Sequence, residues 1–95
     1  EYFALRVKGD CFSVGRNPIH EGYIVIVRRQ PTVENGEIAV VYWPDQEEAV
    51  LRRVERRDGQ VILRADNPAY PVEVVRGRDL TILGKVVGFF GRTCR

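Results

Sequence analysis

Apolar and polar residues alternate along most of the chain with a period of two, which is typical of β-strands. The strands that this pattern predicts are Tyr2–Lys8, Tyr23–Arg28, Glu37–Trp43, Glu48–Arg56, Gln60–Arg64, Val72–Val75 and Leu80–Phe90. Asn35-Gly36 marks a turn, and Asp58-Gly59 marks a hairpin between the fourth and fifth strands. No helical stripe of useful length and no repeat is present. The pattern therefore predicts a compact, mostly antiparallel β domain.

The alternation also predicts which side chains form the core. We expect the apolar side of the strands to bury Leu5, Val7, Ile24, Ile26, Val40, Val50, Val54, Ile62 and Val86. The fourth strand contains an exception, because Val50, Arg52 and Val54 share one face. A charge on an apolar face must be paired or solvated. Arg52 therefore either reaches the rim or pairs with an acid, or it points into a present or former active site.

The composition is that of a small globular domain. The chain has 95 residues, enough for one domain (1–95), and its 44% hydrophobic residues argue against disorder. The net charge of +2 is too small to indicate a nucleic-acid-binding face, although thirteen of the fifteen basic residues are arginine. No apolar run reaches the roughly 20 residues that span a bilayer, and no signal segment opens the chain. We expect a cytoplasmic protein without membrane contact, and a fragment, because a strand begins at once and no initiator Met is present.

Few residues of the chain are candidates for catalysis or metal binding. Cys11 and Cys94 do not make a disulfide framework or a metal site, and we expect two unpaired thiols. The acidic residues show no metal-ligand clustering, so we expect no metal and no cofactor. His20 is the only histidine; it could form a dyad with Cys11, although an ordinary loop histidine is the simpler interpretation. The long irregular segment Gly9–Gly22 is where we expect function, since long loops of this kind are often functional.

Five segments resemble, in this order, the C-terminal domain of LexA, UmuD and phage repressors: residues 3–13, 21–43, 48–54, 61–71 and 80–92. The resemblance covers nearly the whole chain. It implies a bent, mostly β fold that forms a homodimer, joined to an N-terminal DNA-binding part that is missing from this chain. Members of the family cleave their own linker when a RecA filament on single-stranded DNA stabilises the cleavable conformation. The resemblance therefore implies a role in the SOS response, with DNA and a RecA filament as partners.

The family's catalytic positions are only partly matched. Its nucleophile is a serine in a Gly-Asp-Ser-Met-like motif, and its base is a lysine in a Val-Lys-Arg-like strand. Alignment from the left puts residues 9–12 on the first motif, so that Cys11 replaces the serine. Alignment from the right, by the spacing to Gly22, favours Ser13 instead; we prefer Cys11, because its motif directly follows a strand. Counting back from the later loop places Arg52 on the lysine position, in agreement with the strand-face argument.

An arginine cannot act as the base that the family's lysine provides. Lysine serves if burial lowers its pKa toward neutrality, whereas a guanidinium stays protonated. The two lysines lie elsewhere: we expect Lys85 at the surface or an interface, and Lys8 to be solvated at a strand end. Arg52 could instead lower the pKa of Cys11 and produce a reactive thiol. The main interpretation is a regulatory and dimerisation domain of a repressor with a degenerate self-cleavage site.

Two alternatives stay open. An active self-processing peptidase would use Cys11 or Ser13 with an unexpected base, and would need a small-residue cleavage pair in an intact linker. A nucleic-acid-binding β-barrel would use the arginine-rich residues 52–57, and would need an exposed row of aromatic side chains among the arginines. A helix-turn-helix upstream would favour the repressor.

Overall fold

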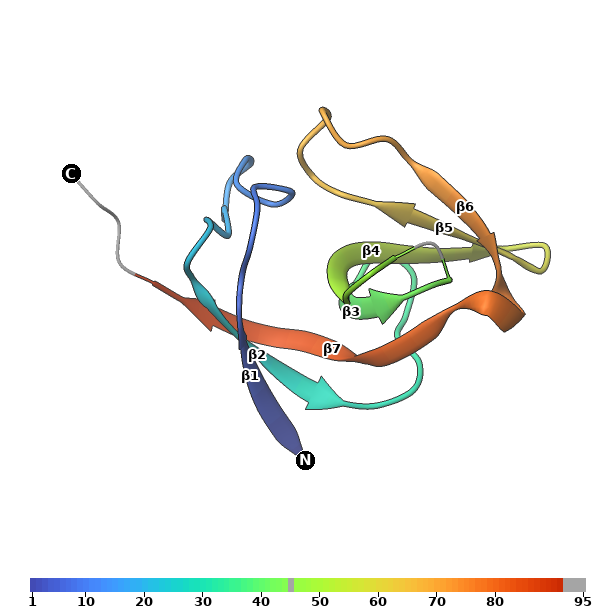
Figure 1. Ribbon diagram of the computed structural model, residues 1–95, viewed down its shortest axis with the longest axis horizontal. Helices are drawn as coiled ribbons and strands as arrows, with labels where there is room; N and C mark the ends of the chain where they lie inside the picture. Colours follow the sequence, from blue (N-terminus) through green and yellow to red (C-terminus); the bar gives the residue numbers. More distant parts are fainter. Residues whose placement is uncertain (45, 92–95) are drawn as a thin grey trace.

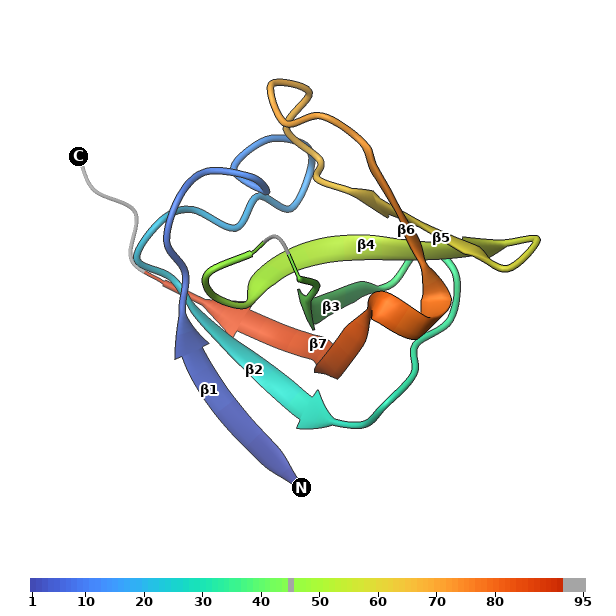
Figure 2. The same ribbon diagram turned by 45° about the vertical axis from the view of Figure 1, so that its right-hand side comes forward.

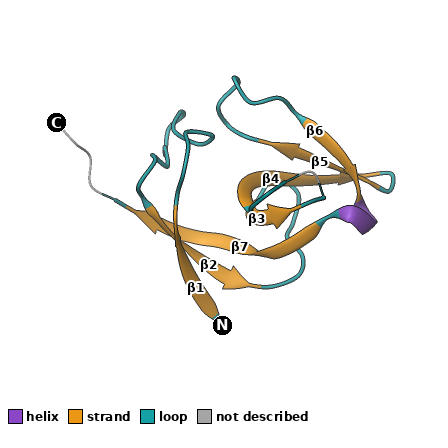
Figure 3. Cartoon of the chain, in the orientation of Figure 1, coloured by secondary structure: helices purple, strands orange, loops and turns teal. Residues whose placement is uncertain are grey.

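The computed structural model describes residues 1–44 and 46–91. The strands in these residues are β1 (Tyr2–Arg6), β2 (Ile24–Arg29), β3 (Ile38–Tyr42), β4 (Val50–Arg57), β5 (Gln60–Arg64), β6 (Glu73–Arg76) and β7 (Thr81–Phe90). A single 3₁₀ turn, η1 (Gly77–Asp79), precedes β7 (Figure 3). All seven predicted strands are confirmed, with ends that differ by at most two residues. The described part of the chain has no helix long and apolar enough to cross a membrane.

The seven strands form one antiparallel sheet in the order β1-β2-β7-β3-β4-β5-β6. The longest strand, β7, joins the two parts of this sheet, because its C-terminal part pairs with β2 and its N-terminal part with β3. The pairing shifts register at Ile26/Val27 in β2 and at Val40/Val41 in β3. Such irregularities bend a sheet, and the strands curve strongly in both views (Figures 1 and 2). The bent, antiparallel β fold is therefore confirmed.

Side chains on both faces of β3 are buried, and this divides the core in two. The first cluster of buried side chains comprises Val7, Cys11, Phe12, Ile19, Val25, Val27, Val40 and Leu51. The second comprises Ala39, Val41, Trp43, Val54, Val61, Leu63 and Ile82. Neighbouring residues of a strand point to opposite faces, so β3 supplies both clusters. This double burial explains why residues 38–43 read as a continuous apolar run rather than as an alternation.

The predicted core is correct in part. Of the nine expected residues, Val7, Val40 and Val54 are buried, Ile24, Ile26, Val50, Ile62 and Val86 are half-buried, and Leu5 is 37% exposed. The fully buried residues of β2 are Val25 and Val27, and those of β5 are Val61 and Leu63. The faces that we expected to be buried in these two strands were therefore wrong. Both faces of each strand carry apolar side chains, so alternation alone does not choose between them.

The loop 9–22 folds back over one end of the sheet, close to the loop between β5 and β6 (Figures 1 and 2). An isolated bridge pairs Phe12 with Ile19, and both side chains are buried in the first cluster. This bridge anchors the loop on the core, and it thereby holds the preceding residue, Cys11, against β4.

Candidate active site

Cys11 lies at the start of the loop that follows β1. Gly9 has a φ of +83°, a left-handed conformation that glycine adopts without strain, and it turns the chain toward β4. The Cys11 side chain is almost completely buried, and its Sγ atom lies 3.9 Å from the carbonyl oxygen of Leu51. The turn thus places a potential nucleophile against β4.

The loop between β5 and β6 holds the backbone around Cys11 in place. The backbone N–H of Asn67 donates to the carbonyl of Cys11 at 2.9 Å, and its side-chain amide donates to the carbonyl of Asp10 at 3.0 Å. The Tyr70 hydroxyl donates to Oδ1 of Asp10 at 2.7 Å, and this hydrogen bond raises the pKa of Tyr70. Neither Asn67 nor Tyr70 was expected at the site, because an Asn-Pro and a Tyr-Pro pair indicate only a loop.

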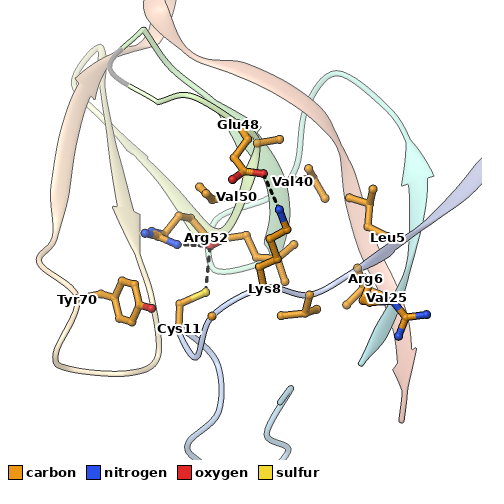
Figure 4. Close-up of a pocket in the computed structure, with 14 residues that line it drawn as sticks. Leu5, Arg6, Lys8, Cys11, Val25, Val40, Glu48, Val50, Arg52 and Tyr70 are labelled. Atoms are coloured by element: carbon orange, nitrogen blue, oxygen red, sulfur yellow. Dashed lines mark hydrogen bonds and ion pairs between the residues drawn. The ribbon is translucent and has the colours of Figure 1, made fainter. Parts of the chain in front are cut away.

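Arg52 is buried, with 9% of its surface exposed, although it carries a charge. Its Nη1 atom donates to the carbonyl oxygen of Leu51 at 2.6 Å, the same oxygen that Cys11 faces (Figure 4). Its guanidinium lies 5.3 Å from the centre of the Tyr70 ring. The expectation that Arg52 reaches the rim was therefore wrong. Arg52 was also expected to pair with an acid, but it forms no ion pair within residues 1–44 and 46–91.

Cys11 and Arg52 line the same cavity, whose volume is about 490 Å³ (Figure 4). Its apolar wall is formed by Leu5, Val7, Val25, Val40, Val50 and Leu51. Ser13 does not line it, and its Oγ donates instead to the carbonyl of Asp10 at 2.9 Å. His20 does not line it either, and packs edge-on against Tyr23 with ring centroids 5.4 Å apart. The fold thus brings Cys11 and Arg52 together, without Ser13 or His20.

Comparison with known proteins matches residues 1–87 to the peptidase S24-like family. The chain belongs to this family. It is 38% identical to the LexA repressor of Cereibacter sphaeroides (strain ATCC 17029) over 88 residues, 93% of this chain, and 45% identical to the LexA repressor of Streptomyces coelicolor over 92 residues, 97% of this chain. Each match covers 37% of the relative, so the chain spans little more than a third of the length of these proteins. The resemblance found in the five segments is confirmed.

In this peptidase S24-like chain, burial raises the pKa of the Cys11 thiol. The charge of Arg52 lowers that pKa, but burial is the larger effect. Cys11 is therefore a protonated thiol near neutral pH, and the reactive thiolate that the sequence allowed is disfavoured. The guanidinium of Arg52 can hold a carboxylate or polarise an oxyanion, but it cannot accept a proton.

Neither lysine is placed as a lysine base would be. Lys8 lines the cavity, but its side chain is mostly exposed and its Nζ lies 3.6 Å from Oε1 of Glu48. Lys85 lies on β7, away from the cavity, with its Nζ 2.7 Å from Oε2 of Glu37. A lysine becomes a base when burial disfavours its charged form, whereas an ion pair favours that form. Among the described residues, no three histidine, cysteine or acidic side chains are grouped to hold a metal ion.

Cys94 lies outside the described residues, so the expectation of two unpaired thiols bears here on Cys11 alone. Cys11 forms no disulfide in the described part of the chain.

Proposed function

We propose that this chain is the C-terminal regulatory and dimerisation domain of a LexA-like transcriptional repressor, with a self-cleavage site that has lost its base. Residues 1–95 form one domain, and an N-terminal part outside this sequence binds DNA. Cys11 occupies the family's serine position, and Arg52 occupies the lysine position. The observation that carries the proposal is the buried guanidinium of Arg52 beside a thiol that burial keeps protonated.

The missing base decides the chemistry. A general base typically contributes about 10²–10⁴-fold in rate, and a guanidinium cannot contribute in this way at any physiological pH. A thiol can become a nucleophile without a base, which a serine hydroxyl cannot, because the thiol ionises by itself at alkaline pH. We therefore expect no self-cleavage near neutral pH, and at most a slow reaction through Cys11 at alkaline pH.

The end of β7 supports the dimer. Val87, Phe89 and Phe90 are all exposed there, although all three are apolar. Adjacent exposed apolar side chains on a small domain are typical of a protein–protein contact. A two-fold dimer suits a repressor, because paired DNA half-sites match a two-fold protein. In this proposal the protein is cytoplasmic, belongs to the SOS response, and meets the RecA filament without being cut.

The arginine-rich hairpin gives little support to direct nucleic-acid binding. Arg57 lies 2.6 Å from Glu55, Arg64 lies 3.7 Å from the same carboxyl group, and Arg53 is paired with Asp66. These ion pairs reduce the charge that the hairpin offers to phosphate. β4 and β5 carry no aromatic residue on which a base could stack.

The proposal is tested by the intact mass of the full-length protein, followed for hours at neutral and alkaline pH with and without an activated RecA filament. The unmodified protein stays whole near neutrality. Cys11→Ala abolishes any slow alkaline cleavage, and the matched variant Ser13→Ala does not. Arg52→Lys restores a candidate base, and cleavage gained by this variant supports the placement of Arg52. Rapid cleavage of the unmodified protein near neutral pH would refute the proposal.

A further inference from the structure

We propose that the cavity beside Cys11 binds a small amphipathic carboxylate, whose carboxyl group pairs with Arg52 and whose apolar body lies against the cavity wall. The inference rests on the proposed function in one respect: a site that no longer cuts a linker is free to serve as a ligand-binding site in the regulatory domain. The occupant is a small molecule with one carboxylate and an aliphatic or aromatic body.

The first observation is the unpartnered donor of Arg52. Its Nη1 is bonded to the Leu51 carbonyl, but its Nε is fully buried and has no acceptor among the described residues. Burying a charge with no opposite charge beside it is unfavourable, and an N–H group without an acceptor adds to that cost. An anion bound in the cavity beside the guanidinium would balance the positive charge of Arg52.

The neighbouring residue, Arg53, shows how a carboxylate binds the Nε and Nη2 donors of a guanidinium. Arg53 presents Nε and Nη2 to the two carboxylate oxygens of Asp66, at 2.7 and 3.0 Å, while its Nη1 donates to the carbonyl of Gly36. Arg52 likewise uses Nη1 on a backbone carbonyl, that of Leu51, but no carboxylate of the described residues occupies its Nε. A planar carboxylate matches the fork of a guanidinium with two parallel hydrogen bonds. The same chemistry in Arg52 therefore favours a carboxylate.

The charges around the cavity favour an anion over a cation. Among the described residues, its lining contains Arg6, Lys8 and Arg52 but only one acidic residue, Glu48. The carboxylate of Glu48 already lies 3.6 Å from Lys8. Arg6 and Lys8 are exposed, whereas Arg52 is buried and has no acidic partner among the described residues. Arg52 therefore supplies the buried positive charge of the cavity lining.

The rest of the cavity favours an apolar body. Its volume of about 490 Å³ lies within the range of small-molecule sites, roughly 300–1,000 Å³. Leu5 is 37% exposed although it is a leucine on a strand, and it lines this cavity. The thiol of Cys11 is protonated near neutral pH and adds no negative charge that would repel the ligand. A single carboxylate on an apolar chain matches one buried cation within apolar walls.

Three probes of equal chain length separate charge from apolar burial: octanoate, octanol and octylamine. Binding is measured by chemical-shift titration and by the protection of Cys11 from alkylation. We expect octanoate to bind more tightly than the other two and to protect Cys11. Arg52→Met keeps an extended apolar side chain and removes the charge; we expect it to weaken octanoate binding about tenfold or more, as loss of a charge-assisted hydrogen bond does, and to leave octanol unaffected.

Two further variants keep the test decisive if Arg52→Met does not fold. Ala49→Phe places a bulky side chain among the exposed lining residues, and we expect it to abolish octanoate binding. Arg78→Met removes an exposed arginine of η1, outside the cavity, and leaves binding unchanged. Equal affinity for octanoate and octanol, or no binding of octanoate, would overturn the inference.

The two proposals fail in different ways. Self-cleavage near neutral pH overturns the proposed function, and octanoate binding would still be measurable on the intact chain. Absence of octanoate binding overturns the carboxylate site alone, because the intact-mass experiment does not depend on a ligand.

Discussion

The Cys11 thiol and the Arg52 guanidinium meet at a single acceptor, the carbonyl oxygen of Leu51, with Sγ at 3.9 Å and Nη1 at 2.6 Å. Burial raises the pKa of the Cys11 thiol and so favours its protonated form. The nearby charge of Arg52 opposes this effect, but burial prevails. The two residues are thus adjacent without forming the nucleophile and base of a hydrolytic dyad.

The first prediction concerns the ionisation of Cys11. Burial raises the pKa of its thiol, so the pH midpoint for alkylation by iodoacetamide should lie above the ordinary value of about 8.5. Arg52 lowers that pKa, so Arg52→Met should move the midpoint to still higher pH. Ser13→Ala is the matched control and should leave it in place, since Ser13 does not line the cavity. An alkylation midpoint below pH 8.5 in the unmodified protein would contradict the conclusion that burial raises the pKa of Cys11.

The second prediction concerns the packing of β7 on β2. A β-carbon on Gly84 would meet the carbonyl oxygen of Arg28 and lie 2.6 Å from Cγ1 of Val27, so a backbone atom would have to move. Gly84→Ala should therefore lower the free energy of unfolding by about 1–3 kcal/mol, as overpacking does. A β-carbon on Gly88 of the same strand would have no neighbour within 4 Å. Equal urea midpoints for Gly84→Ala and Gly88→Ala would show that this close approach is absent.

The third prediction concerns self-association through the end of β7. Val87 is 45% exposed there. Val74 is 55% exposed and lies in β6, the edge strand of the sheet beyond β5. A charge buried in an apolar contact is costly, so Val87→Asp should shift sedimentation toward monomer while Val74→Asp leaves the dimer intact. Sedimentation of the unmodified domain as monomer at high concentration would remove the basis of this prediction.

The fourth prediction concerns acid stability. The hydrogen bond from Lys85 holds the pKa of Glu37 below its ordinary value of about 4.3. The ionised carboxylate therefore stabilises the fold above that value, and this contribution is lost as the pH falls through the lower, folded-state pKa. Glu37→Gln should show a smaller loss of unfolding free energy between pH 6 and pH 3 than the unmodified protein, in urea titrations at each pH. The exposed Glu21→Gln should behave like the unmodified protein, and an equal effect of both variants would contradict the pairing.

The strands could be read from the sequence because their determinants are local. The hairpin at Asp58-Gly59 is an example: Asp58 and Gly59 both have positive φ, the conformation that a tight turn between two twisted strands requires. The continuous apolar run of β3 was recognised as a strand even though both its faces are buried. The sheet order could not be read in this way, because β7 lies between β2 and β3 although it is last in the chain.

At the site, sequence and structure contributed different parts. The sequence by itself determined the seven strands and the family, and it marked Arg52 as anomalous, because alternation, turn residues and motif order lie along the chain. It left open whether Cys11 or Ser13 faces Arg52. It also gave no sign of the hydrogen bonds by which Asn67 and Tyr70 hold the backbone around Cys11. Only the tertiary structure decided these points and the buried faces of β2 and β5, because they depend on which distant segments the bent sheet brings together.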